Sequence, residues 1–298
     1  MKKGDLWNRL LTTTHHALRS GALIPLNTHG VALEDDSGAR FLVRILSNLQ
    51  RKDRARGQQA RAEGAGQQRN PFLPPEPDLT VGEVGETHLA VLNKFNVVEN
   101  HLLLVTRSFE DQELLLSLED FAALLFCLRE YDALGFYNGG REAGASQQHK
   151  HLQLVPLPLS EGHASVPIAS LLPAAAPGAL APIPGFPFVH AFVRLNRDVV
   201  AAAPAESEVF QLYATMLTHV GMEAAEPSHA KRQSMPYNFL ITREWMLLVP
   251  RTGEFFEDIS LNSLAFAGSL FVRNEAQYAR LREVGPVQAL RAVTVSGN

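Results

Sequence analysis

The 298-residue sequence contains a single cysteine, Cys127. One thiol cannot form an internal disulfide, so the chain does not belong to the disulfide-stabilised secreted domains. Cys127 stands in the apolar run 121–128, where we expect a buried structural thiol. The sequence also lacks closely spaced cysteine pairs and the His-x₃-His spacing, which argues against a structural zinc site.

Excess charge and long apolar runs are also absent. A formal net charge of −4 argues against general nucleic-acid binding, which depends on many Lys and Arg contacts to phosphate. Apolar runs such as 102–105 are far shorter than the ~20 residues of a membrane-spanning helix, and the first residues lead into a polar segment rather than an apolar signal core. We therefore expect a cytoplasmic protein that binds neither nucleic acid nor membrane.

What is present is enough apolar sequence for a substantial core. Hydrophobic residues make up 46% and charged residues 19% of the chain, which predicts one large domain or two closely packed ones. The segment 51–70 is rich in Gln, Arg, Ala and Gly and has almost no large apolar residue. That composition favours a mobile loop.

The most informative segment is 144–156, Gly-Ala-Ser-Gln-Gln-His-Lys-His-Leu-Gln-Leu-Val-Pro. Alternate residues of a strand face the same way, so His149, His151 and Gln153 are expected to line one surface. A neutral imidazole there can attack an electrophilic phosphorus, and the small residues before it allow backbone N–H groups to approach phosphate. From this motif alone, two half-buried strand histidines or two zinc ligands remain alternatives.

Periodicity predicts the surrounding elements. The N-terminal helix has a possible cap at Asp5 and the helix after Ser117 has a capping box; an Ala/Pro-rich connection, 171–187, separates two halves. We expect strands at 41–46, 88–92, 101–105, 134–137, 188–195, 237–241 and 245–251, helices at 6–18, 117–131 and 209–220, and a core helix that includes Leu261, Leu264, Phe266, Leu270 and Phe271.

An internal echo supports two related halves. The segments 101–107 and 245–251 share a Leu-Leu-Val-x-Arg core, and an asparagine precedes each, at Asn93 and Asn238. Such an echo is suggestive of a duplication. The second half has no His-x-His-x-Gln motif, so we expect one active site per chain.

Three segments together resemble the ATP adenylyltransferase family. They are Leu-Asn-Lys-Phe-Asn-Val-Val-Glu at 92–99, Leu-Leu-Val-Thr-Arg at 103–107 and Gly-Ala-Ser-Gln-x-His-Lys-His-Leu-Gln at 144–153. Members of this family are diadenosine tetraphosphate phosphorylases, in the transferase branch of the histidine triad superfamily. The likeness extends from about residue 41 to residue 271. Gln153 stands where the hydrolases of the superfamily have a third histidine.

The resemblance implies an α+β fold of the histidine-triad and galactose-1-phosphate uridylyltransferase-like kind, with a mostly antiparallel sheet from two related halves and flanking helices. We expect a catalytic half at 1–170, the connection at 171–187, and a second half at 188–298. The reaction implied is reversible phosphorolysis of diadenosine tetraphosphate to ATP and ADP through an adenylyl-histidine. The alternatives are a nucleotidyltransferase that uses another phosphate acceptor, either a sugar phosphate or adenylylsulfate, and a sensor that binds dinucleotides without turnover.

The resemblance also assigns roles to individual residues. His151 is the expected nucleophile, with its second ring nitrogen donating to a backbone carbonyl such as that of His149, and Gln153 and Ser146 are expected to stabilise charge. The expected substrate-binding residues are Lys52, Asn93, Lys94, Asn138, Gly144, Ala145, Gln147, Asn238 and Arg243. For Lys52 a solvated loop charge is the alternative, and for Asn138 plain turn chemistry.

Partners and cofactors follow from the same resemblance. The expected ligands are a dinucleoside polyphosphate, ATP, ADP and phosphate. We expect no tightly bound cofactor and no protein-held metal, but Mg²⁺ or another divalent ion that arrives with the polyphosphate. We expect a monomer rather than a homodimer.

Overall fold

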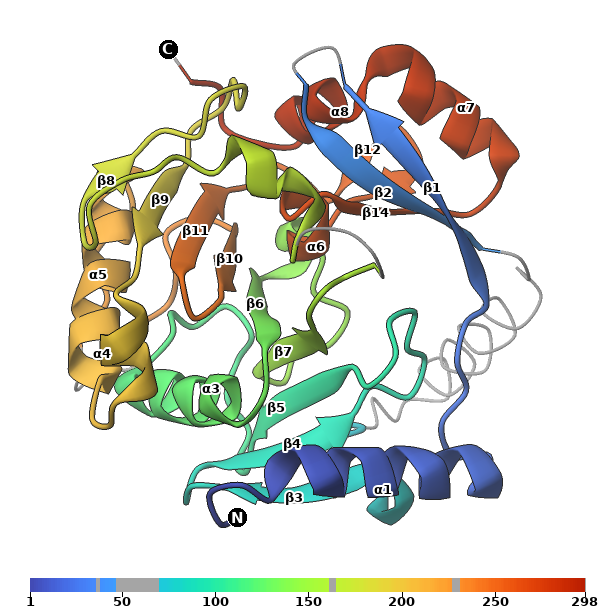
Figure 1. The fold of residues 1–298 in the computed structure, drawn as a ribbon, viewed down its shortest axis with the longest axis vertical. Coiled ribbons are helices and arrows are strands. Elements are labelled where there is room, and N and C mark those ends of the chain that lie inside the picture. Colours follow the sequence, from blue (N-terminus) through green and yellow to red (C-terminus); the bar gives the residue numbers. More distant parts are fainter. Residues whose placement is uncertain (36–37, 47–69, 161–164, 227–230, 298) are drawn as a thin grey trace.

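The computed structural model describes residues 1–35, 38–46, 70–160, 165–226 and 231–297. Its centre is a nine-stranded sheet in which every neighbouring pair is antiparallel (Figure 1). In spatial order the strands are β3 (Thr80–Val84), β4 (His88–Leu92), β5 (Leu102–Thr106), β7 (His151–Pro156), β6 (Ala133–Gly139), β10 (Tyr237–Ile241), β11 (Trp245–Pro250), β9 (Ala191–Arg194) and β8 (Leu180–Ala181). The expected antiparallel α+β architecture is confirmed.

A second, three-stranded sheet joins the beginning and the end of the chain. Its middle strand, β2 (Arg40–Leu46), pairs antiparallel with β1 (Thr28–Glu34) and parallel with β14 (Ser269–Val272). Two short strands, β12 (Phe255–Phe256) and β13 (Ile259–Ser260), form a small hairpin. Figure 1 places this sheet with the C-terminal helices on one side of the molecule.

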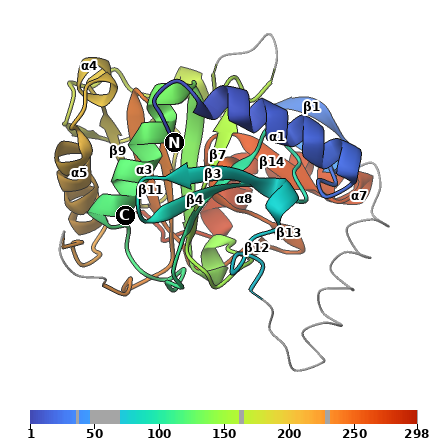
Figure 2. The ribbon, with the colours of Figure 1, turned by 90° about the horizontal axis from the view of Figure 1, so that it is seen from below.

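Helices cover the sheets. They are α1 (Leu6–Ser20), α3 (Leu118–Glu130), α4 (Arg197–Ala201), α5 (Glu206–His219), α6 (Ser263–Phe266), α7 (Glu275–Val284) and α8 (Pro286–Ala292), with short 3₁₀ helices η1 (Pro77–Leu79), η2 (Arg141–Ala143) and η3 (Pro167–Leu171). Figure 2 shows α1 alongside β3, the edge strand of the large sheet. Within the described ranges, no helix is both long and apolar enough to cross a membrane.

The alternation of side chains along each strand divides the core into two layers. On β7, Leu152 and Leu154 pack in one hydrophobic cluster with α1, α3 and α5. Val155 packs on the opposite face, in a second cluster with β2, β14 and helices α6 to α8. His151 and Gln153 alternate with Leu152 and Leu154 as Val155 does, so they face the layer that contains the three-stranded sheet.

The order of elements repeats between the two halves. In the first half the chain runs through β4, β5, α3, β6 and β7, and its strands lie side by side in the order β4-β5-β7-β6. In the second half the chain runs through β8, β9, α5, β10 and β11, and its strands lie in the order β8-β9-β11-β10. The halves meet where β6 pairs with β10, with Asn138 opposite Asn238. In this arrangement β11 is the counterpart of β7, and β5 is the counterpart of β9. The match between segments 245–251 and 101–107 was therefore wrong. Those two strands are alike in apolar composition but do not hold equivalent places in the two halves.

The helix expected near the C-terminal end of the chain also needs correction. The expected core helix at 261–271 is only the four-residue α6, and the chain then continues as β14. Gly268 has a positive φ of 90°, and a side chain there would meet Pro167 at 2.8 Å. The chain turns out of the helix at that glycine.

The ends of α1 and α3 are stabilised differently. Asp5 makes no side-chain cap on α1; instead the Glu130 carboxylate accepts hydrogen bonds from the backbone N–H groups of Gly4 and Leu6. The proposed Asp5 cap was therefore wrong. On α3, Ser117 and Asp120 form the expected capping box.

Candidate active site

The nucleophile candidate, His151, is fixed by two groups at the start of β7. Its ring Nδ1 lies 2.8 Å from the carbonyl oxygen of His149, to which it donates. Its backbone N–H donates to Gln112 Oε1 at 2.8 Å, and Gln112 Nε2 donates to the carbonyl oxygens of Asn138 and His151. Since Nδ1 carries the proton, the lone pair of the neutral ring is on Nε2. The expected donation to the His149 carbonyl is confirmed.

The environment keeps the His151 ring neutral. Burial lowers the pKa of His151 to about 4, although the hydrogen bond to the His149 carbonyl opposes the shift. The side chain is 3% exposed. An ordinary imidazole with a pKa of about 6.5 is partly protonated at neutral pH, so burial increases the fraction of the nucleophilic form.

We expect the His151 ring to remain neutral from about pH 8 down to about pH 5, because its pKa is lowered rather than raised. Ring ¹⁵N chemical shifts, assigned by comparison with His151→Gln, measure this directly. A titration with a midpoint near the ordinary value of about 6.5 contradicts the expected burial of the ring.

His149 differs from His151 because both of its ring nitrogens are occupied. Asn70 Oδ1 accepts from the Phe72 backbone N–H, which turns Asn70 Nδ2 toward His149 Nδ1 at 2.8 Å. His149 Nε2 then carries the proton and donates to the Thr106 carbonyl oxygen at 2.8 Å. His149 therefore has no free nitrogen lone pair for attack, whereas its carbonyl orients His151.

An aromatic side chain covers the two histidines. The Phe72 ring centroid lies 5.6 Å from that of His149 and 5.5 Å from that of His151. Phe109 contacts His149 from another direction, with a centroid distance of 5.5 Å, and is 57% exposed. The segment after residue 69 thus supplies part of the site's apolar wall.

Gln153 takes its orientation from a buried histidine. Gln153 Oε1 accepts from His101 Nε2 at 2.9 Å, and His101 Nδ1 accepts from Asn93 Nδ2 at 3.2 Å. Burial lowers the pKa of His101 to about 4, so this ring is also neutral. Asn93, an expected substrate ligand, is thus bonded to His101, and its direct contact with substrate stays a prediction.

Lys150, between the two histidines, faces the opposite layer. Its Nζ lies 2.5 Å from Asp120 Oδ2 and 3.3 Å from Glu110 Oε2, and it donates to the Leu115 carbonyl. Burial alone favours a protonated Asp120, but the Lys150 ammonium and a hydrogen bond from His88 hold the pKa of that carboxyl well below its usual value. This buried ion pair anchors the start of β7 to the N-terminus of α3.

The two asparagines at the junction of the halves are interior residues. Asn138 is 2% and Asn238 0% exposed. Asn138 Oδ1 accepts from Asn238 Nδ2 at 2.9 Å and from Ser263 Oγ at 2.7 Å, and Asn238 Oδ1 accepts from Arg251. The strand register brings the two side chains face to face and gives both internal partners; their expected contacts with substrate stay predictions.

The segment before His149 is a tight turn. Gly144 has φ of 93°, and a side chain there would meet Asn262 at 2.8 Å. The Gly144 and Ala145 N–H groups donate to the carbonyls of Arg141 and Gly140 within the turn, and their expected contacts with phosphate stay predictions. Ser146 is exposed and Gln147 half-exposed after this turn, and their expected contacts with phosphate stay predictions.

The remaining expected substrate ligands are Arg243, Lys94 and Lys52. Arg243 follows the far end of β10 from Asn238 and donates to the Leu128 carbonyl, so the structure does not bring it to His151. Lys94 is paired with Glu76 at 2.5 Å. Lys52 lies outside the described residues, and its role stays a prediction.

Sequence reasoning missed several groups that position the histidines. They are Gln112, Thr106, Asn70 and Phe72, and of these four only Thr106 lies in a segment that carries the resemblance, 103–107. Their importance arises from side-chain contacts between elements distant in sequence. His101 carried a weak signal, since it begins a strand expected to lie in the same sheet.

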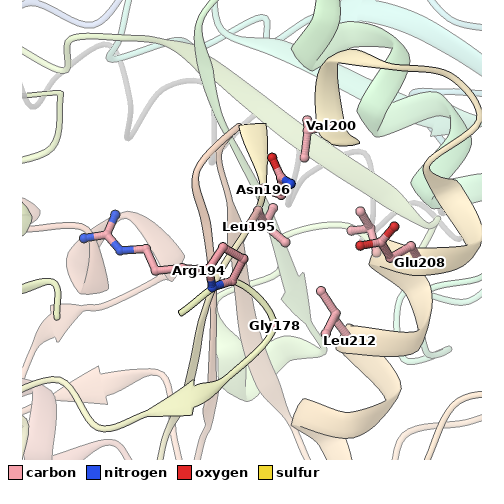
Figure 3. A pocket seen from close by; sticks show the side chains of 9 residues that line it. Gly178, Arg194, Leu195, Asn196, Val200, Glu208 and Leu212 are labelled. Carbon is pink, nitrogen blue, oxygen red and sulfur yellow. The ribbon is translucent and has the colours of Figure 1, made fainter. Parts of the chain in front are cut away.

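Other hollows and clusters do not coincide with this site. A hollow of about 160 Å³ is bordered by Gly178, Asn196, Glu208 and Leu212 (Figure 3). Arg194, also at its border, donates to the carbonyls of Leu172 and Pro173. Among the described residues, no group of three or more His, Cys, Asp or Glu side chains is arranged to hold a metal ion.

Comparisons with known proteins agree with this geometry. Residues 1–174 match the family model of the Ap4A phosphorylase N-terminal domain, where Ap4A is diadenosine tetraphosphate, and residues 184–296 match that of the ATP adenylyltransferase C-terminal domain. Two Saccharomyces cerevisiae proteins are similar over 72% of this chain and 72% of their own length. They are Protein APA1, 27% identical, and diadenosine 5',5'''-P1,P4-tetraphosphate phosphorylase 2, 28% identical.

The fold is shared with a solved structure. Yeast Ap4A phosphorylase Apa2 superimposes with a TM-score of 0.78 at 21% identity, covering 100% of this chain and 97% of that one. Its complex with Ap4A gives a TM-score of 0.77 at 21% identity and covers 100% of both chains. The two family models span both halves of the sheet, with the His-x-His-x-Gln strand in the first, and the chain therefore belongs to the Ap4A phosphorylase family of ATP adenylyltransferases.

Proposed function

We propose that this protein catalyses reversible phosphorolysis of Ap4A by inorganic phosphate to ATP and ADP, with His151 as the nucleophile. The observation that carries the proposal is the state of the His151 ring. Its Nδ1 is held by the His149 carbonyl, and its buried ring is neutral. Nε2 is therefore available to attack an electrophilic phosphorus.

In the first step, His151 Nε2 attacks the α-phosphorus of Ap4A in line with the bond to the leaving group. The P–O bond to the triphosphate breaks, ATP leaves, and adenylate is bonded to the ring. The His149 carbonyl stabilises the positive charge that develops on the ring, because Nδ1–H remains its donor. The ring becomes a good leaving group once it is adenylylated.

In the second step, inorganic phosphate attacks the same phosphorus and the bond to Nε2 breaks, which gives ADP and returns the neutral ring. Two in-line displacements produce net retention at phosphorus. One phosphoanhydride replaces another, so the reaction runs in both directions. Transition states of this kind spread charge over the phosphoryl oxygens, and positioned donors supply much of the catalysis.

We assign the surrounding donors as follows. Gln153, whose Oε1 is occupied by His101, donates from its amide nitrogen to a non-bridging oxygen. Ser146 and Gln147 stabilise the leaving polyphosphate, and Lys52 reaches its distal phosphates. A divalent ion such as Mg²⁺ arrives with the polyphosphate, held by its oxygens and by water.

A steady-state assay on Ap4A with and without phosphate tests the activity. We expect ATP and ADP to form only when phosphate is present. Turnover without phosphate, with AMP as a product, indicates a hydrolase instead. Binding without turnover in either condition indicates a sensor, and the use of galactose 1-phosphate or sulfate as a better acceptor indicates one of the other transferases.

Replacement of Gln153 by histidine tests the choice of acceptor. We expect Gln153→His to lower phosphorolysis about tenfold, the factor of one ordinary hydrogen bond, and to raise release of AMP, because histidine occupies this place in the hydrolases of the superfamily. Product analysis by chromatography measures both. Unchanged phosphorolysis means that Gln153 does not contact the reacting phosphate.

A further inference from the structure

His101 lies on the same face of the sheet as the catalytic pair. It immediately precedes β5, in which Leu102 is opposite Leu154 and Val105 is opposite His151. Alternation along β5 therefore places His101 with Leu103 and Val105 on the face of His151 and Gln153. Its ring is 8% exposed and contacts Phe136, with centroids 5.8 Å apart.

The direction of every hydrogen bond in this chain of side chains is determined by a backbone amide. Asn93 Oδ1 accepts from the Phe95 N–H at 3.3 Å. Since a backbone N–H can only donate, Asn93 must turn Nδ2 toward His101. His101 Nδ1 is then an acceptor, and the ring carries its proton on Nε2, from which it donates to Gln153 Oε1 at 2.9 Å.

The neutral state of His101 preserves this direction. A protonated ring donates from both nitrogens and would conflict with the Asn93 amide. Burial lowers the pKa of His101 to about 4, with the neighbouring His151 as a further, smaller cause. The ring therefore keeps one donor and one acceptor throughout the neutral range.

We propose that His101 is a positioning residue that makes Gln153 a hydrogen-bond donor to the reacting phosphoryl group. With Oε1 held by His101, the Gln153 amide nitrogen remains on the other side of Cδ, toward the face where His151 acts. If the Gln153 amide were turned the other way, its carbonyl oxygen would face the negatively charged phosphoryl oxygen, and the two oxygens would repel each other. This inference rests on the proposed function, in which Gln153 stabilises the transition state.

The proposal predicts the effect of changing the hydrogen-bonding capacity of residue 101. His101→Met replaces the imidazole by an apolar side chain of similar size, and so removes both ring nitrogens. We expect kcat for Ap4A to fall about tenfold, because an ordinary net hydrogen bond supplies about that factor. KM is expected to change little, since the donor acts mainly in the transition state.

His101→Gln should restore most of the lost rate. Its amide can accept from Asn93 Nδ2 and donate to Gln153 Oε1, as the ring does. His190→Met is the matched control, because His190 is another histidine with both ring nitrogens bonded, to the Phe188 carbonyl and the Ile183 N–H. It lies next to β9 in the second half, and its replacement should leave kcat unchanged.

A double-mutant cycle gives the decisive test. If His101 acts through Gln153, then His101→Met lowers kcat in the wild type but has no further effect in Gln153→Met. Additive losses in the double variant, or a full rate in His101→Met, overturn the proposal. Failure of the wild type to turn over Ap4A contradicts the proposed function instead. Thermal unfolding of every variant identifies losses that arise from instability.

A second variant tests the same chain of bonds from its other end if His101→Met does not fold. Asn93→Leu removes the donor to Nδ1, so His101 can adopt either tautomer. We expect a loss of kcat of about two- to tenfold, and again no further loss when Gln153 is already Met. If Asn93→Leu lowers kcat as much in the Gln153→Met background as in the wild type, then Asn93 and His101 do not act through Gln153.

Discussion

His151→Ala is expected to lower kcat for Ap4A phosphorolysis by several orders of magnitude while nucleotide binding persists. The ring supplies the attacking Nε2, and no other described side chain in the site offers a free imidazole nitrogen, because both nitrogens of His149 are bonded. Removal of a nucleophile in acyl transfer has cost about 10⁶ in kcat. Steady-state rates and equilibrium titration with Ap4A measure the two quantities separately.

His149→Ala is the matched comparison. It keeps a carbonyl at position 149, so Nδ1 of His151 retains its acceptor. We expect a smaller loss than for His151→Ala. A larger loss in His149→Ala, or residual activity of His151→Ala within about tenfold of the wild type, contradicts the assignment of the nucleophile.

The second large effect is on stability. Lys150→Met should lower the free energy of unfolding by about 3–5 kcal/mol, since it leaves the carboxylate of Asp120 buried without its ammonium partner. The Lys150 and Asp120 side chains are 2% and 1% exposed, so water cannot replace the lost contact. Urea unfolding monitored by fluorescence gives the difference directly.

The pH dependence and a second substitution check the cause. In Lys150→Met the pKa of Asp120 is expected to rise, because burial favours the neutral acid once the cation is gone. The deficit in stability should then shrink as pH falls and Asp120 takes up a proton. Asp120→Asn in the Lys150→Met background should recover part of the loss. Equal stabilities of Lys150→Met and wild type contradict an energetically important pair.

Much of the sheet could be predicted because its strands are short, apolar and separated by turn residues. The capping box of Ser117 and the alternation at 149–153 have direct structural consequences, since both depend on residues close together in sequence. The helix expected over 261–271 failed because its spacing is helical up to Phe266, whereas Gly268 adopts a positive φ against η3. That contact is made by a distant segment, and the sequence pattern contains no sign of it.

Some residues of the candidate site could be predicted from the sequence and others could not. His151 and its acceptor at His149 follow from neighbouring residues, so local reasoning sufficed. Gln112, by contrast, acts by replacing backbone partners at the start of β7, which depends on how the loop after β5 folds back. Arg243 was placed in the site from likeness alone, but the direction of β10 carries it to the opposite end.

The most direct test of the central claim is capture of the covalent intermediate. Wild-type protein is incubated with Ap4A in the absence of phosphate, quenched in base, where the phosphoramidate bond survives, and digested for mass spectrometry. We expect one adenylate on the peptide that contains the motif, with fragmentation that assigns it to His151, and its discharge to ADP when phosphate is added before quenching. An adenylate on His149, or formation of ADP with inversion at phosphorus and no enzyme-bound adenylate, contradicts the account.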